Sequence, residues 1–303
     1  MTSLHSTTTP AATPDLLRPH RKPESVQAQV WRRFHRNPLA LFGVAALVLL
    51  ALSAIFAPWL APYDPNAVDP YAALQPPSPD HWLGTDDLGR DVLSRLLFAG
   101  RVSLLVGLFT ALVAVLFGAL LGAIAGFYGG MTDGVIARFI DVMLSLPVVP
   151  LALVFSAFVP ITPLRLTLIL AAVSWMGVAR LVRGEFLRLR HAQFTEAARS
   201  IGTPNLRIIS VHLLPNAISP ILVAATLLVA YAILIESALS FLGFGIQPPT
   251  ATWGNMLFNA QRYLRNAPWL AIFAGVVISL TVASINFVGD GLREAIDPRL
   301  KER

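Results

Sequence analysis

Six long apolar stretches contain no Asp, Glu, Lys or Arg, and they restrict the fold more than any other feature of the sequence. A helix needs about 20 apolar residues to span the hydrocarbon core of a bilayer, and five of the stretches reach that length. The stretches are 38–63, 102–132, 142–164, 166–179, 208–235 and 266–289. The short one, 166–179, extends through Val182 if the flanking arginines snorkel to the interface. These stretches predict an all-α polytopic membrane protein with six transmembrane helices.

Composition supports the same class. Only 13% of the 303 residues are charged and 55% are hydrophobic, whereas a soluble domain carries about 25% charged residues. The chain has no cysteine, which excludes disulfides, thiolate metal sites and cysteine nucleophiles. The first 28 residues lack the apolar core of a signal peptide, so we expect a partly disordered tail there.

The basic residues predict the orientation. With the N-terminus inside, 17 of the 23 Lys and Arg residues fall in inner segments, so the positive-inside rule places both termini in the cytoplasm. A polar loop at 193–215 then also faces the cytoplasm. The predicted division is a cytoplasmic tail at 1–36, a first transmembrane helix at 37–61, an extracytoplasmic segment at 62–100, a core with five transmembrane helices at 101–292 and a cytoplasmic tail at 293–303.

The extracytoplasmic segment ends in GTDDLGRDVLSRLLFAGR, which has the pattern of a loop that passes into an amphipathic helix. Leu93, Leu96 and Leu97 fall on one face, with Asp91 and Arg95 opposite. This pattern fits a helix on the outer membrane surface; an ordinary loop packed on the bundle is the alternative. Residues 238–267 form a second outer region, where many Gly and Pro residues predict irregular backbone followed by a short surface helix.

Small residues recur in the second predicted span, at Gly118, Gly122 and Gly126. Such a face lets helix backbones approach closely in lipid. It fits tight packing inside this bundle, and the alternative is an interface to a partner subunit or a seam along which helices slide.

Two acidic residues border the spans. Asp141 begins the third predicted span, where a salt bridge to Arg138 or another inner arginine is the simplest interpretation. Glu236 lies near the outer boundary, where a hydrogen-bonded carboxylate is the simplest interpretation and a part in gating is the alternative.

The inner loop carries more structure than a connection between two spans requires. Within EAARSIGTPNLRIISVHLLP, at 196–215, the opening residues favour a helix and Gly202 suits a left-handed C-terminal cap. Thr203 and Pro204 suit the N-cap and first turn of a second helix. Pro215 should reset the backbone before the next span. The pattern predicts a positively charged helix–turn–helix that projects from the bundle as a docking element.

Several kinds of chemistry are excluded. The chain has two lysines, neither in a phosphate-binding GxxxxGK[ST] loop, so it cannot hydrolyse ATP by that route. Its six histidines are scattered without zinc-ligand spacing. The spans carry no deeply placed ionisable group, which counts against a secondary transporter and an intramembrane aspartate protease. We therefore expect no catalytic residue, metal or cofactor in this chain.

Together, four motifs carry a specific resemblance. The 196–215 loop resembles the EAA loop of permease subunits from binding-protein-dependent ABC importers. GTDDLGRDVLSRLL, ALSFLGFGIQPPTATWGNML and GDGLREAIDPR are similar to the dipeptide/oligopeptide/nickel branch, in particular its second, C-type permease. The matches cover roughly residues 28–300.

The resemblance implies the fold of a type I ABC importer permease with a cytoplasmic coupling helix pair, placed in a bacterial inner membrane. It implies a homologous second permease, two cytoplasmic ATPase subunits that bind ATP, and an extracytoplasmic solute-binding protein, with no nucleic acid. It assigns ATPase coupling to Glu196, Ala197, Ala198, Arg199, Gly202, Thr203, Pro204, Asn205, Leu206, Arg207 and Pro215.

The alternative function is a secondary transporter or channel that works alone. The structured inner loop and the uncharged spans argue against it. The sequence does not name the cargo, because importers of peptides, nickel, glutathione and other solutes share these motifs.

Overall fold

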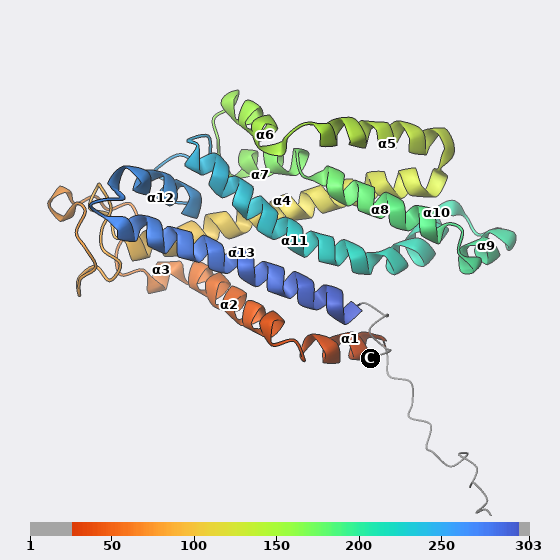
Figure 1. Ribbon diagram of the computed structural model, residues 1–303, viewed down its shortest axis with the longest axis horizontal. Helices are drawn as coiled ribbons and strands as arrows, with labels where there is room; N and C mark the ends of the chain where they lie inside the picture. Colours follow the sequence, from red (N-terminus) through yellow and green to blue (C-terminus); the bar gives the residue numbers. More distant parts are fainter. Residues whose placement is uncertain (1–25, 297–303) are drawn as a thin grey trace, which may run out of the picture.

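The computed structural model describes residues 26–296, so the predictions for residues 1–25 and 297–303 lie outside its described part. Within 26–296 the chain is helical, and its β-structure is limited to one isolated bridge between Thr85 and Asp91. The long helices lie side by side along the longest axis of the molecule (Figure 1). The all-α prediction is confirmed.

Four helical stretches are long and apolar enough to cross a membrane: α2 (Pro38–Ile55), α4 (Val92–Tyr128), Asn205–Phe241 and α13 (Pro268–Ile296). Two further pairs pass the same test together, each bent at a short break. The helices α5 (Gly130–Ser145) and α6 (Val148–Ala157) meet at 83°, and α7 (Pro163–Ala172) and α8 (Trp175–Leu189) meet at 43°. With each bent pair counted as one span, the described residues contain the six spans that the sequence predicts.

The third span differs from its prediction. It begins at Gly130 rather than at 142, so Asp133 and Asp141 lie within α5. Both carboxylates are compensated by α8, because Arg183 Nη2 donates to Asp133 Oδ2 at 2.8 Å and Arg180 Nη2 donates to Asp141 Oδ1 at 2.6 Å. A search for charge-free stretches missed this half of the span because its charges are paired between helices.

The central helix is α4, which packs most extensively against α8. Gly118, Gly122 and Gly126 lie at this contact. A Cβ atom at the first two would collide with the carbonyl oxygens of Trp175 and Ala179, and one at Gly126 would collide with Phe186. The glycine face therefore lies against a helix of the same chain.

The start of α4 also differs from its prediction. The expected amphipathic surface helix is the first part of α4 itself, which begins at Val92, and Asp91 caps it by accepting a hydrogen bond from Ser94 N at 2.8 Å. Arg95 is only 1% exposed. Its guanidinium lies 3.5 Å from the Asp86 carboxylate and donates to Pro65 O at 3.1 Å. The loop before α4 folds over the helix and supplies these partners, which the helical pattern alone does not reveal.

Shorter elements gather at the two ends of the bundle (Figure 1). One end holds α1 (Val26–Phe34), α9 (Gln193–Ser200), α10 (Asn205–Arg207) and the last turn of α13. The other end holds α3 (Ala57–Leu60), α12 (Trp253–Ala260) and the loop before α4, which contains the short turn η2 (Pro70–Ala72). A further short turn, η4 (Gln261–Tyr263), follows α12.

Helix α12 begins at Trp253, inside the stretch predicted to be irregular, and the short surface helix predicted after Leu257, up to Arg265, is instead the end of α12 and the largely exposed turn η4. In α12, Trp253 is 2% exposed and its Nε1 donates to Leu96 O at 3.1 Å, which ties α12 to α4. The irregular backbone predicted before it is present between Phe241 and Trp253.

Candidate functional site: the loop between α8 and α11

The loop leaves α8 through three residues and turns at once into α9. Thr195 anchors this turn, because its buried hydroxyl donates to Leu189 O at 2.8 Å, across the α8–α9 junction. Glu196 lies in the first turn of α9, where a carboxylate interacts favourably with the helix dipole. The loop thus begins as a continuation of α8 that is held by a specific hydrogen bond.

A Schellman motif ends α9. Gly202 has a φ of +78°, the left-handed conformation that the sequence predicts there. Thr203 N donates to Ala198 O at 3.1 Å, and Gly202 N donates to Arg199 O at 2.9 Å. These two bonds satisfy the last carbonyls of the helix and fix the direction of the chain as it leaves α9.

The second half of the loop departs from its prediction in two places. Pro204, rather than Thr203, is the N-cap, and helix begins at Asn205. Pro215 does not reset the backbone, since the helical path runs from Asn205 to Phe241. A wider, π-helical turn, η3 (Ile208–Leu213), precedes α11 (Leu214–Phe241) and accommodates the proline, which lacks an N–H donor. Asn216 Nδ2 donates to His212 O at 2.6 Å within the same region.

One face of the loop is buried. Ala198, Ile208 and Leu213 belong to a core cluster that includes Phe127 of α4 and Phe186 of α8. The guanidinium of Arg199 lies 5.4 Å from the centre of the Phe127 ring. The loop is therefore seated on the bundle by apolar packing and a cation–π contact.

The opposite face of the loop exposes large apolar side chains at its tip. Ile201 is 83% exposed and Leu206 is 77% exposed, on either side of the Gly202 turn. Of the residues predicted for this site, Glu196, Ala197, Arg199, Asn205 and Arg207 are also exposed, whereas Ala198 is buried. Sequence reasoning missed Ile201. The sequence feature that could have identified it is an apolar residue directly before the capping glycine, in a segment that is otherwise polar.

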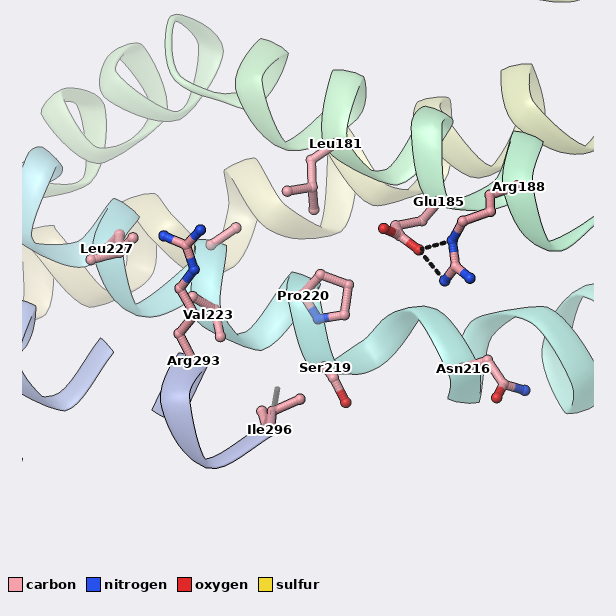
Figure 2. Close-up of a pocket in the computed structure, with 11 residues that line it drawn as sticks. Leu181, Glu185, Arg188, Asn216, Ser219, Pro220, Val223, Leu227, Arg293 and Ile296 are labelled. Atoms are coloured by element: carbon pink, nitrogen blue, oxygen red, sulfur yellow. Dashed lines mark hydrogen bonds and ion pairs between the residues drawn. The ribbon is translucent and has the colours of Figure 1, made fainter. Parts of the chain in front are cut away.

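A cavity of about 590 Å³ lies beside the root of the loop, between α8, α11 and the end of α13 (Figure 2). Glu185 and Arg188 project from α8 and form an ion pair at 2.7 Å. Arg293 reaches into the cavity from α13 and makes no ion pair with any residue in 26–296. The lining residues are Leu181, Glu185, Arg188, Asn216, Ser219, Pro220, Val223, Ala224, Leu227, Arg293 and Ile296. The sequence did not predict this cavity, because its walls come from distant segments.

Glu236 lies at the other end of α11 and is fully buried. Ser240 Oγ donates to its Oε1 at 2.9 Å, and Ser103 Oγ of α4 donates to its Oε2 at 3.3 Å. Ser103 Oγ also accepts a hydrogen bond from Trp253 N at 3.2 Å, so the group joins α4, α11 and α12. This arrangement confirms the interpretation of Glu236 as a hydrogen-bonded carboxylate. Within 26–296, no cluster of three His, Cys, Asp or Glu residues forms a metal-binding group.

Two family models match this chain. Residues 118–302 match the binding-protein-dependent transport system inner membrane component, and residues 25–77 match the N-terminal TM domain of oligopeptide transport permease C. Together they cover α2, the last part of α4, all later helices and the loop between α8 and α11, and leave residues 78–117 unmatched.

Curated relatives extend the match to nearly the full length. A dipeptide transport system permease protein of Alkalihalophilus pseudofirmus is 40% identical over 296 residues, covering 96% of this chain and 97% of the relative. A di/tripeptide transport system permease protein of Pseudomonas aeruginosa is 39% identical, covering 99% of both chains. A glutathione transport system permease protein of Shigella flexneri is 42% identical, covering 92% of this chain and 94% of the relative.

The predicted resemblance is thereby confirmed, and it excludes the alternative of a carrier that works alone. Permease subunits of this kind have no ATPase site of their own, and partner subunits hydrolyse the ATP. The chain belongs to the family of inner membrane components of binding-protein-dependent transport systems, as a permease subunit of an ABC importer.

Proposed function

We propose that the loop between α8 and α11 is the element through which a cytoplasmic ATPase subunit drives this permease. The observation that carries the proposal is the exposure of Ile201 and Leu206 on a loop whose backbone is fixed. Two highly exposed apolar side chains on one ordered loop are typical of a protein–protein contact. Arg199 and Arg207 beside them add positive charge, so we expect a groove with an apolar floor and acidic edges on the ATPase.

The connections of the loop explain how such a contact would move the bundle. The chain passes from α8 to α9 in three residues, and from α10 to α11 without a break in the helical path. Because α8 and α11 also form two walls of the inner cavity, a tilt of the docked loop would act on both walls together. Gly202 and the Schellman bonds keep the loop stiff enough to transmit the tilt.

We propose that the end of the bundle with this loop faces the cytoplasm, together with both chain termini. Helix α1, the last turn of α13 and the loop lie at the same end of the structure (Figure 1), and the excess of Lys and Arg falls in these segments. The complete importer would contain this chain, a homologous second permease, two ATPase subunits and an external solute-binding protein.

We propose a small peptide or a peptide-like solute as the cargo. The support comes from the relatives, whose names specify dipeptides, di- and tripeptides or glutathione. The charged residues lining the inner cavity are confined to Glu185, Arg188 and Arg293, and the first two are paired. We therefore expect the permease to provide a weak transit site, with tight selection by the external protein.

The docking proposal is tested by the double substitution Ile201→Asp with Leu206→Asp. We expect the protein to reach the membrane in normal amount but to lose its ATPase partner during purification, because charge replaces the apolar contact. The matched control is Met131→Asp, an 86% exposed apolar residue outside the loop, which should retain the ATPase. Normal ATPase retention by the double variant would contradict the docking proposal.

The cargo proposal is tested separately, in vesicles that contain both permeases and the ATPases. Without the external protein we expect little ATP-driven uptake of dipeptides. Addition of the cognate external protein should restore uptake with that protein's own specificity. Selective accumulation without any external protein would show that the permeases themselves hold a tight binding site, contrary to the proposal.

A further inference from the structure

A second hollow lies on the outside of the bundle, far from the loop. It is a groove of about 330 Å³ between α2 and α4. Aliphatic side chains form its walls: Ala51, Ala54 and Ile55 from α2, and Leu104, Leu105 and Leu108 from α4. The remaining lining residue is Arg101, so the groove combines one cation with an otherwise apolar wall.

Arg101 has no anionic partner within residues 26–296. Its side chain is exposed. Its guanidinium lies over the Phe98 ring, 5.9 Å from the ring centre, and among the described residues this is the contact it makes. Arg95, two turns earlier on the same helix, is by contrast buried against Asp86. A guanidinium in an apolar setting is stable only with an anion or water to accept its hydrogen bonds. The free donors of Arg101 therefore point to an external acceptor.

The neighbours of Arg101 indicate how deep in the membrane the groove lies. It lines the same groove as Ile55, the last residue of α2. Phe56 and Trp59, which follow directly, are 46% and 77% exposed, as aromatic residues at a membrane–water boundary are. Leu108 is seven residues further along α4, about 10 Å deeper at 1.5 Å per residue. The groove thus runs from the outer boundary, where the cation lies, down into the hydrocarbon region.

We propose that this groove binds one phospholipid of the outer leaflet, with its phosphate on Arg101 and one acyl chain along α2 and α4. The cation and the apolar wall follow one another in the same order as the parts of a phospholipid. The phosphate of a phospholipid lies at the membrane boundary, and its acyl chains begin directly below. The groove is also open to its surroundings, because the lining side chains of Ile55, Leu105 and Leu108 are 59%, 52% and 54% exposed. An arginine offers paired donors to phosphate oxygens, and its charge favours an anionic headgroup.

The experiment uses the full chain, purified with its partner subunits in a mild detergent. The complex is incubated with phosphatidylglycerol, phosphatidylethanolamine or diacylglycerol, and bound lipid is counted by native mass spectrometry. We expect one phosphatidylglycerol per copy of this chain to survive washing, weaker retention of phosphatidylethanolamine, and none of diacylglycerol, which lacks the phosphate. Each basic residue near a membrane surface contributes about 1 kcal/mol to anionic lipid binding, so Arg101→Gln should reduce retention about five-fold.

Two further variants separate the parts of the site. Ala51→Leu fills the groove and leaves Arg101 in place, and we expect it to reduce retention as well. Arg265→Gln removes an exposed arginine that does not line the groove, and it should retain lipid normally. Equal retention by the wild type and Arg101→Gln, equal binding of diacylglycerol, or the absence of retained lipid would overturn the proposal. A cross-link from a cysteine at position 51 to the second permease would also overturn it, because protein would then fill the groove.

Discussion

The two ends of this bundle differ in which side chains they bury and which they expose. At the end with α12, the loop before α4 buries charge: Asp86 is 8%, Arg90 5% and Arg95 1% exposed. At the end with α9, the loop between α8 and α11 instead exposes Ile201 and Leu206. The first end pairs its buried charges within the chain, although Arg95 Nη2 and Trp269 Nε1 have no acceptor among the described residues, whereas the second leaves apolar surface without cover from those residues. The contrast lies in the charged residues: the end with α12 buries its ion pairs, although it also exposes Tyr71 (97%) and Trp82 (70%), whereas the end with α9 presents apolar side chains on an ordered turn, as the proposed docking requires.

The buried charges of the outer end depend on Asp86. Its carboxylate accepts hydrogen bonds from Leu88 N at 2.9 Å and from Arg90 Nε at 2.7 Å, and it lies 3.5 Å from Arg95. One anion therefore supports two buried guanidinium groups and a turn of the backbone. A buried charge whose partner is removed is far more costly than an exposed one.

The largest effect is accordingly expected for Asp86→Ala. Breaking a buried ion pair by removing one partner costs about 3–5 kcal/mol, and here two arginines lose their nearest anionic partner. We expect a large loss of thermal stability in detergent and poor accumulation in the membrane. Asp87→Ala is the matched control, because Asp87 is more exposed and 3.9 Å from Arg90. If Asp86→Ala were as stable as this control, the outer end would not depend on its buried charges.

A smaller loss is expected at Glu236, which joins α4, α11 and α12. Glu236→Ala leaves the buried hydroxyls of Ser103 and Ser240 without their acceptor, at a cost of about 1–3 kcal/mol. Glu236→Gln keeps an oxygen acceptor and should recover most of the stability. Thermal unfolding of both variants distinguishes the roles. Equal damage by Gln and Ala would show that the carboxylate itself, rather than its hydrogen bonds, is required.

At the inner end, Gly202→Ala should affect coupling more than overall stability. A Cβ atom at Gly202 meets no other atom within 4 Å, so its cost comes from the φ of +78° alone, about 1–2 kcal/mol. We expect normal insertion in the membrane but reduced ATPase retention and transport. The control is Gly184→Ala in α8, which has equal space and an ordinary φ. Unchanged coupling in Gly202→Ala would show that the Schellman turn is not needed.

The sequence predicted the parts of this structure that depend on local chemistry. The apolar stretches identified the four long candidate spans and the two bent helix pairs, and the capping preference of glycine identified the left-handed turn at Gly202. Both features arise within a few residues, through hydrophobic length and backbone conformation.

The parts that the sequence did not predict depend on partners distant along the chain. Arg95 was placed on a polar face because Asp86 and Pro65 reach it only after the outer loop folds back. The start of the third span was missed because Asp133 is compensated by Arg183, 50 residues away. Pro215 was expected to interrupt the helix, and a wider turn at 208–213 absorbs it instead. In each case a tertiary contact or a rare helical geometry overrides the local signal.

The proposed docking places the tip of the loop between α8 and α11 in contact with an ATPase subunit. Because the chain has no cysteine, a single cysteine at position 201 or 206 can carry a photoactivatable cross-linker without background labelling. In membranes that contain the whole importer, we predict a cross-link from either position to an ATPase subunit, and none from position 71, where Tyr71 is 97% exposed at the outer end. Absence of the ATPase cross-link from both tip positions, with labelling of those positions by an impermeant reagent from outside, would contradict the account.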